Sequence, residues 1–113
     1  MELRSLSVVE PFTTKDGSTI RELHHTAVQS LAEASLDPGQ ATKRHYHART
    51  EEIYLITAGG GVLEVDGDSR TVSVGDAALI PPGAWHELVA GPTGARLLCI
   101  CVPAYSHEDT FFE

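Results

Sequence analysis

Residues 45–52 read His-Tyr-His-Ala-Arg-Thr-Glu-Glu, which places two histidines and two carboxylates close together in the chain. Side chains of an extended strand alternate between its two faces, so His45 and His47 would point to the same side. A glutamate on the following strand could complete a cluster on that side. Neutral imidazoles and a carboxylate suit iron, manganese, nickel, copper or zinc. We therefore interpret this stretch as half of a candidate metal site.

The length and composition of the chain fit one soluble globular domain. It has 113 residues, of which 42% are hydrophobic and 21% are charged, an ordinary balance for a single folded domain. There are 16 acidic and 8 basic residues, so the net charge is −8. Binding to nucleic acid or to an anionic membrane requires a basic surface. We therefore expect neither nucleic acid nor membrane as a partner.

The chain carries no sign of membrane insertion or export. No segment approaches the roughly 18 consecutive apolar residues of a transmembrane helix, and residues 1–5 lack the apolar run of a secretory signal. Cys99 and Cys101 are the only cysteines. Two residues apart on a strand, their side chains run parallel and are poorly placed to form a disulfide. We expect reduced thiols and a cytoplasmic protein.

Short segments rich in Val, Ile, Leu and Thr alternate with Gly and Pro along most of the chain. This pattern is typical of many short antiparallel strands joined by turns, as in a sandwich or barrel. The expected strands are 19–24, 27–36, 43–47, 52–58, 61–65, 69–74, 77–80, 86–90 and 95–102.

Three of these segments allow a more detailed prediction. Residues 62–72 predict a hairpin, because Asp66-Gly67 supplies the positive φ angles of a tight type I′ turn. Residues 29–36 contain Ala and Glu, which favour a helix, but the following Pro38-Gly39 and the strands beyond it favour a strand. Residues 97–102 are continuously apolar and predict a strand that is buried on both faces.

Two longer motifs carry a family resemblance. The first is Gly39-x5-His45-x-His47-x4-Glu52-x6-Gly59, and the second is Gly75-x5-Pro81-x-Gly83-x2-His86. Both resemble the two motifs of the cupin superfamily, in the right order and with the right internal spacing. One position departs from the family pattern, since Ala90 stands where asparagine is usual. That asparagine is not a metal ligand in the pattern.

The resemblance implies an all-β fold, a double-stranded β-helix or jelly-roll barrel. We expect one cupin domain over residues 1–113, with a barrel core at about 19–103. An N-terminal strand and a C-terminal tail would pack outside that core. Small cupins commonly pair through an outer sheet face, and the apolar N-terminal segment has no evident partner in a minimal barrel. We therefore also expect a homodimer.

The resemblance further implies that His45, His47, Glu52 and His86 converge on one divalent transition metal per chain. The identity of the metal (Fe, Mn, Ni, Cu or Zn) is left open. Glu51 competes with Glu52 for the ligand role, but only Glu52 keeps the six-residue spacing to Gly59. Three imidazoles and one carboxylate would leave coordination positions open for a small molecule, as in a catalytic rather than a structural site.

Several functions are compatible with such a site. The resemblance favours a metal-dependent enzyme, a dioxygenase-like oxidoreductase that acts on a small oxygenated organic substrate. Glu52 is the candidate base, and Tyr54, which shares its strand parity, is a second candidate catalytic residue or a core tyrosine. The alternatives are a metal-dependent isomerase or cyclase, and a non-catalytic cupin that binds or senses a sugar or phenolic ligand. The choice among them rests on analogy, because one fold hosts many reactions.

Overall fold

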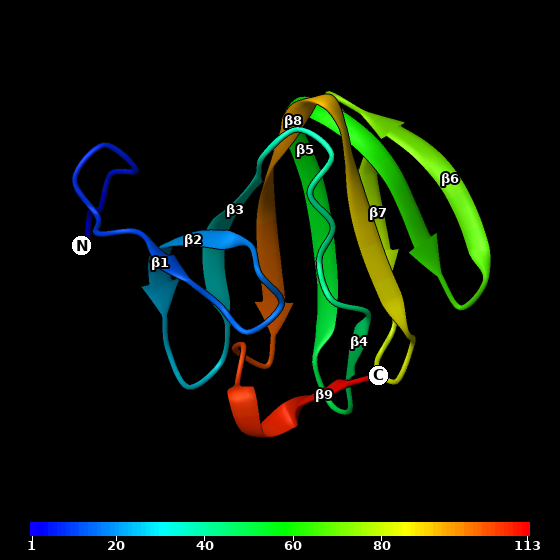
Figure 1. Cartoon of the computed structure of the whole chain (residues 1–113). Coiled ribbons are helices and arrows are strands. Elements are labelled where there is room, and N and C mark those ends of the chain that lie inside the picture. The colour runs from blue at the N-terminus through cyan, green and yellow to red at the C-terminus, as the bar shows by residue number, and fades with distance from the viewer.

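The computed structural model describes residues 1–113 and is built almost entirely of antiparallel strands that curl into a barrel (Figure 1). No helix is long and apolar enough to span a membrane. The elements are β1 (Phe12–Thr13), β2 (Thr19–His25), β3 (Ser30–Leu36), β4 (His45–His47), β5 (Glu51–Val65), β6 (Asp68–Ser73), β7 (Ala77–Ile80), β8 (His86–Val102), the 3₁₀ helix η1 (His107–Asp109) and β9 (Thr110–Phe112).

The two long strands β5 and β8 pair along most of their lengths and join the two sides of the barrel. The first half of β5 lies between the second half of β8 and β7, and β3 and β2 follow beyond β8. The second half of β5 lies between the first half of β8 and β6, and β4 and β9 follow beyond β8. Each long strand was expected as two separate strands. Both instead continue through a bend, where the register shifts.

Glycines make these bends possible. Gly59, Gly60 and Gly94 have φ angles of 65°, 157° and 79°, values that are costly for other residues. Gly61 has no such angle, but a Cβ atom there would overlap the carbonyl oxygen of Val89 on the paired strand. The backbones of β5 and β8 therefore approach more closely at the bend than any side chain would allow.

The core lies between the two sides of the barrel and is formed by alternate residues of the strands. It is continuous and entirely aliphatic except for Tyr54. Its members are Ala34, Leu36, Tyr54, Ile56, Leu63, Val72, Ile80, Ala84, Leu88, Ala90, Ala95 and Leu97. This pattern of inward apolar residues is the one expected for a small barrel that is filled by side chains.

Two local predictions are confirmed. Residues 30–36 form strand β3 rather than a helix. The predicted hairpin joins β5 to β6, with Val65 opposite Asp68 and with φ angles of 48° at Asp66 and 86° at Gly67. Both cysteines are free.

The prediction that residues 97–102 are buried on both faces is wrong. Leu97 and Cys101 are buried on the inner face, whereas Val102 on the outer face is 49% exposed. Leu98 and Ile100, also on the outer face, are half-buried. Their neighbours across the sheet are Leu55 and Ile53, so this part of the outer face is apolar without being covered. The expected homodimer stays a prediction.

The C-terminal tail folds back onto the barrel and forms an additional strand. In β9, Thr110 pairs with His47 and Phe112 pairs with His45. The Asp109 carboxylate accepts hydrogen bonds from the backbone N–H groups of Arg49 and Thr50 at 3.1 Å. The tail therefore does more than pack outside the barrel, because it holds the β4–β5 loop and lies beside both histidines of β4.

The close approach at the bend gives a direct test of the fold. We expect Gly61→Ala to lower the free energy of unfolding by roughly 2–4 kcal/mol, because the added methyl group must push two paired backbones apart. Gly67→Ala is the matched control, since a Cβ atom there meets no atom within 4 Å. Its left-handed backbone should cost only about 1 kcal/mol. Urea denaturation of both variants measures the difference, and equal losses would contradict the packing described for the bend.

Candidate metal centre

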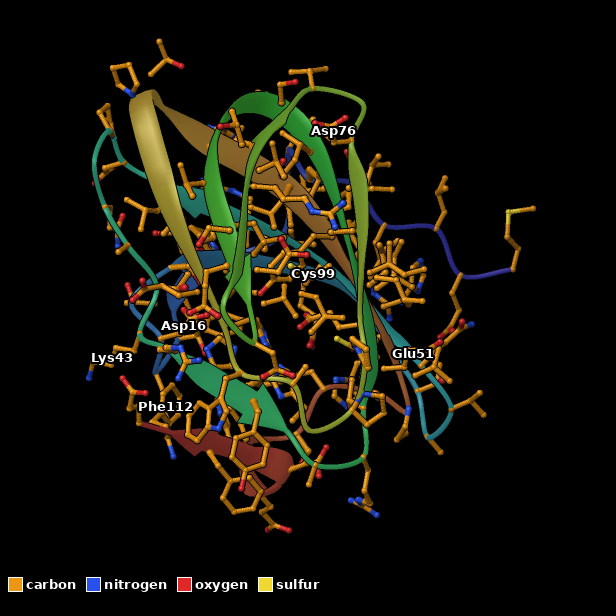
Figure 2. The ribbon with its side chains drawn as sticks, turned by 90° about the vertical axis from the view of Figure 1, so that its right-hand side faces the viewer. Asp16, Lys43, Glu51, Asp76, Cys99 and Phe112 are labelled. Carbon is orange, nitrogen blue, oxygen red and sulfur yellow. The ribbon has the colours of Figure 1, made fainter.

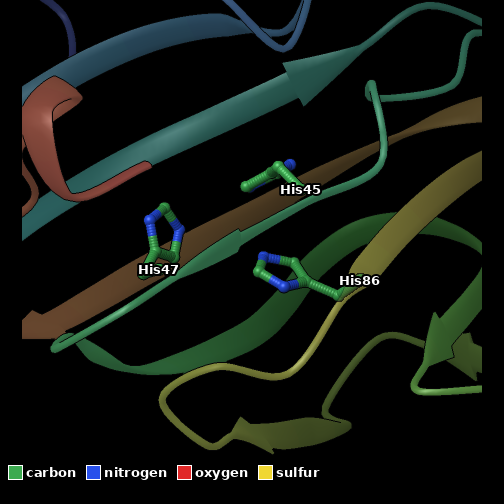
Figure 3. A group of neighbouring side chains, drawn as sticks. All are labelled: His45, His47 and His86. Carbon is green, nitrogen blue, oxygen red and sulfur yellow. The ribbon is translucent and has the colours of Figure 1, made fainter. Parts of the chain in front are cut away.

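Three histidines from two adjacent strands meet inside the barrel. His45 and His47 extend from β4, and His86 begins β8, where it pairs directly with His45 (Figure 3). One ring nitrogen from each histidine lies within 4.8 Å of the other two. All three side chains are buried, with exposed fractions of 3%, 3% and 1%. The side chains of β4 alternate between the inside and the outside of the barrel, so His45 and His47 both point inward. The turn at residues 81–84 brings the chain back beside β4, where His86 begins β8.

The Nδ1 atom of each histidine is already hydrogen-bonded within the protein. His45 Nδ1 lies 2.7 Å from the Lys43 carbonyl oxygen, and His86 Nδ1 lies 3.0 Å from the Ala84 carbonyl oxygen. A carbonyl can only accept, so both Nδ1 atoms carry the proton. In the neutral ring, the proton-free nitrogen is then Nε2, which is the form in which imidazole binds a metal.

His47 reaches the same state through a side chain of the tail. Its Nδ1 lies 2.9 Å from Thr110 Oγ1, and the Thr110 hydroxyl donates to the Ser106 carbonyl at 2.8 Å. The hydroxyl therefore accepts from His47, which again leaves Nε2 free. Burial and the neighbouring His86 also lower the pKa of His45, which favours the neutral imidazole.

Glu52 places a carboxylate against two of these rings. Its Oε1 atom lies 3.3 Å from His47 Nε2 and 3.6 Å from His86 Nε2. Burial raises the pKa of the Glu52 carboxyl, but the adjacent His47 and His86 have the larger opposite effect and lower this pKa to about 2. The carboxyl group is therefore ionised. Its other oxygen, Oε2, accepts a hydrogen bond from the Cys101 thiol at 3.2 Å.

Two buried polar atoms lack a hydrogen-bond partner, Glu52 Oε1 and His86 Nε2. A buried polar atom without a partner costs free energy, so both would gain from a shared cation. Three neutral imidazoles and one ionised carboxylate match the donor preferences of a divalent first-row metal. The residues present therefore fit the metal that the sequence motifs imply, with His45, His47, His86 and Glu52 as the groups that would hold it.

The two neighbouring glutamates have opposite environments. Glu51 is exposed and lies at the edge of the molecule in Figure 2, whereas Glu52 is buried among the histidines. Tyr54 follows Glu52 on the inner face of β5, with its ring 5.9 Å from the ring of His86. Burial, together with the charge of Glu52, raises the pKa of Tyr54 well above its usual value. The Tyr54 hydroxyl therefore stays protonated.

A cavity of about 70 Å³ adjoins the cluster. A water molecule needs roughly 10–15 Å³ of such volume, so the cavity has room for a small molecule beside the histidines. Cys99 lies near the middle of the barrel (Figure 2) and is part of the cavity wall. The lining residues are Phe12, Thr14, Asp16, Ser18, Ile20, Glu22, Ser30, Ala32, Ala34, Leu36, Thr42, His45, His47, Glu52, Tyr54, Leu88, Leu97, Cys99, Cys101, Tyr105, Thr110 and Phe112.

Sequence reasoning missed several of these residues. Thr110 and Phe112 lie in a tail without clear periodicity, although their spacing of two matches that of His45 and His47, with which they pair. Asp16 lies in the loop before β2, and nothing in the sequence near it resembles a motif. The shared parity of Cys99 and Cys101 is the one sequence signal that placed both on a single face.

Comparison with known proteins gives three informative relatives. An uncharacterized protein of Methanocaldococcus jannaschii is 43% identical over 108 residues, which cover 90% of this chain and 86% of that protein. Dimethylsulfoniopropionate lyase DddW of Ruegeria pomeroyi is 35% identical over 74% of this chain and 50% of the lyase. Gentisate 1,2 dioxygenase 1 of Aquipseudomonas alcaligenes is 36% identical over 46% of this chain but only 15% of the dioxygenase. The chain therefore matches no more than half of either named enzyme.

Solved structures show the same fold. Pac13, described as a nucleoside dehydratase, has a TM-score of 0.85 and 15% identity, with 100% of this chain and 91% of that chain covered. An RmlC-like cupin from Shewanella frigidimarina has a TM-score of 0.84 and 23% identity, with 96% and 95% covered. The family model for the cupin domain matches residues 32–101, more than half of the chain and all four residues of the candidate metal centre. The chain therefore belongs to the cupin family, and its fold is the jelly-roll barrel of that family.

Proposed function

We propose that this chain is a metal-dependent enzyme that acts on a small oxygenated organic molecule inside the barrel. One observation carries the proposal: Glu52 Oε1 and His86 Nε2 are buried without hydrogen-bond partners beside His45 and His47, and His45, His47 and Glu52 line a cavity. A purely structural site would be closed by its ligands, whereas this one faces an enclosed space. A dioxygenase-like reaction is the finer proposal, and a lyase or isomerase reaction is the alternative.

The residues of the candidate metal centre would have separate roles in the reaction. His45, His47 and His86 are fixed by their Nδ1 hydrogen bonds and would hold the ion through Nε2. When bound, a divalent metal supplies Lewis acidity and a binding position for substrate oxygen atoms. Glu52 is ionised and unpartnered at Oε1, so it could hold the ion or accept a proton from the substrate. Tyr54 stays protonated and can donate a hydrogen bond.

The relatives support this proposal without deciding between reaction classes. One is named a dioxygenase and another a lyase, and the lyase match covers more of this chain. A non-catalytic cupin that only binds a small ligand is the second candidate function. The oxalate-binding protein of Thermotoga maritima, 28% identical over 73% of this chain, is a relative named for binding alone.

Metal content gives the first test of the site. We expect the purified protein to bind about one equivalent of a first-row divalent metal per chain. The double variant His45→Ala, His86→Ala should lose it, because two of four donors are removed. His25→Ala is the control, since that histidine is exposed and lies outside the cavity. Elemental analysis measures all three proteins, and an undiminished equivalent in the double variant would overturn the site.

Cys101 is placed to orient the carboxylate of Glu52. The thiol is buried, and burial together with the Glu52 charge raises its pKa. It therefore stays protonated and donates to Glu52 Oε2. This hydrogen bond occupies one carboxylate oxygen and leaves Oε1 beside His47 and His86. Groups that orient a metal ligand in this way typically contribute about 10- to 100-fold to metal affinity.

We accordingly expect Cys101→Ala to weaken metal binding at least about tenfold. Cys101→Ser should restore much of the loss, because a hydroxyl can donate the same hydrogen bond. Cys99→Ala is the matched control, since Cys99 lines the same cavity but makes no hydrogen bond to the carboxylate. Competition with a metal chelator measures the affinities. Equal affinity in folded Cys101→Ala and wild-type protein would show that the thiol does not orient Glu52.

Activity separates the candidate functions. With iron(II) loaded, we expect oxygen uptake in the presence of small catechols or 1,3-diketones, and Glu52→Gln should reduce it at least about 100-fold if Glu52 acts as the base. Product analysis by NMR under anaerobic conditions detects a lyase or isomerase reaction instead. A flat response in both assays, together with ligand-dependent thermal shifts of the metal-loaded protein, would favour the non-catalytic binding function.

A further inference from the structure

The wall of the cavity carries carboxylates but no lysine or arginine. Its acidic members are Asp16, Glu22 and Glu52. The arginines of the chain make ion pairs with carboxylates that do not line the cavity, and both lysines are exposed. A substrate carboxylate or phosphate would therefore find no lysine or arginine in this cavity, whose basic side chains are His45 and His47.

Asp16 is the carboxylate without a counter-charge. Its Oδ1 accepts hydrogen bonds from the backbone N–H and the hydroxyl of Ser18, at 2.8 and 2.6 Å, but it has no ion-pair partner within 4.0 Å. The negative charge of Asp16 also acts on two tyrosines that line the cavity. It adds to burial in raising the pKa of Tyr54 on one wall and of Tyr105 on another. The half-buried Asp16 therefore contributes an uncompensated negative charge next to the ligand space.

A bound metal would not reverse this balance. A divalent ion would add two positive charges against the three carboxylates of the wall, so the loaded cavity would still carry a net charge of about −1 if each carboxylate is ionised. Phe12 and Phe112 also line the cavity, and aromatic faces attract organic cations. Since Phe12 is 46% exposed, the aromatic and acidic groups extend from the buried histidines towards solvent.

We propose that the cavity takes a small organic cation, such as an alkylammonium compound with a hydroxyl or carbonyl oxygen. The cationic group lies near Asp16, and the oxygen points towards the histidines. The placement of the ligand oxygen rests on the proposed function, because that oxygen would bind the metal held by the histidines. The volume limits the ligand to roughly five to seven non-hydrogen atoms, on the estimate of 10–15 Å³ for each water-sized volume.

Three probes of nearly equal shape test the charge preference. Choline is the cation, 3,3-dimethylbutan-1-ol is its neutral isostere, and 2,2-dimethylpropanoate is an anion with the same number of non-hydrogen atoms. Titration calorimetry with zinc-loaded and with metal-free protein should give the tightest binding for choline, about tenfold tighter than the neutral alcohol. The anion should bind most weakly. Equal or tighter binding of the alcohol or the anion, or no binding of choline at millimolar concentrations, would overturn the proposal.

Substitutions test which residue of the cavity causes the preference for a cation. Asp16→Asn keeps an acceptor oxygen for Ser18, and we expect it to weaken choline binding about tenfold while leaving the neutral alcohol unchanged. Asp37→Asn is the control, because Asp37 is exposed and lies outside the cavity. A choline affinity that is the same in Asp16→Asn and wild-type protein would exclude Asp16 as the recognising group. The metal-free titration keeps this result separate from the proposed function, which fails instead if the protein binds no metal.

Discussion

The candidate metal centre depends on the hydrogen bond that each cavity histidine makes through Nδ1. Without it, a buried imidazole could turn or change tautomer, and its Nε2 atom would have no fixed direction. Two of these bonds go to backbone carbonyls near the histidine itself, those of Lys43 and Ala84. The backbone two residues before each ring therefore orients His45 and His86. The third bond, from His47, goes to Thr110, and it makes the orientation of that ring depend on a distant part of the chain.

The barrel is the means of bringing these groups together. His45 and His86 face each other across β4 and β8, while Glu52 and Cys101 face each other across β5 and β8. Strand β8 therefore connects the histidine side of the site to the carboxylate side. It can do so because it bends between its two halves, where glycines let it pass β5 at close range. The geometry of the site is in this sense a property of the bend as much as of the ligands.

The sequence predicted the local features of this arrangement well. Period-two alternation placed His45 and His47 on one face, and the motif spacing distinguished Glu52 from Glu51. It did not reveal contacts between residues far apart in the chain, such as Thr110 with His47, 63 positions away, or Cys101 with Glu52, 49 positions away. No local pattern encodes such pairs. The burial of residues 97–102 was misjudged for a related reason, because an apolar outer face looks the same in sequence whether or not another surface covers it.

The return of the tail has a consequence for the order in which the site forms. Residues 45–52 and 86 leave the ribosome before Asp109 and Thr110 do. Until then, the β4–β5 loop lacks its carboxylate anchor and His47 lacks its Nδ1 partner. A chain synthesised only as far as the end of β8 would therefore contain most strands of the barrel, while the candidate metal centre would still lack these two contacts. A chain that lacks residues 109 and 110 would therefore hold an ion at this candidate site less firmly than a chain that includes them.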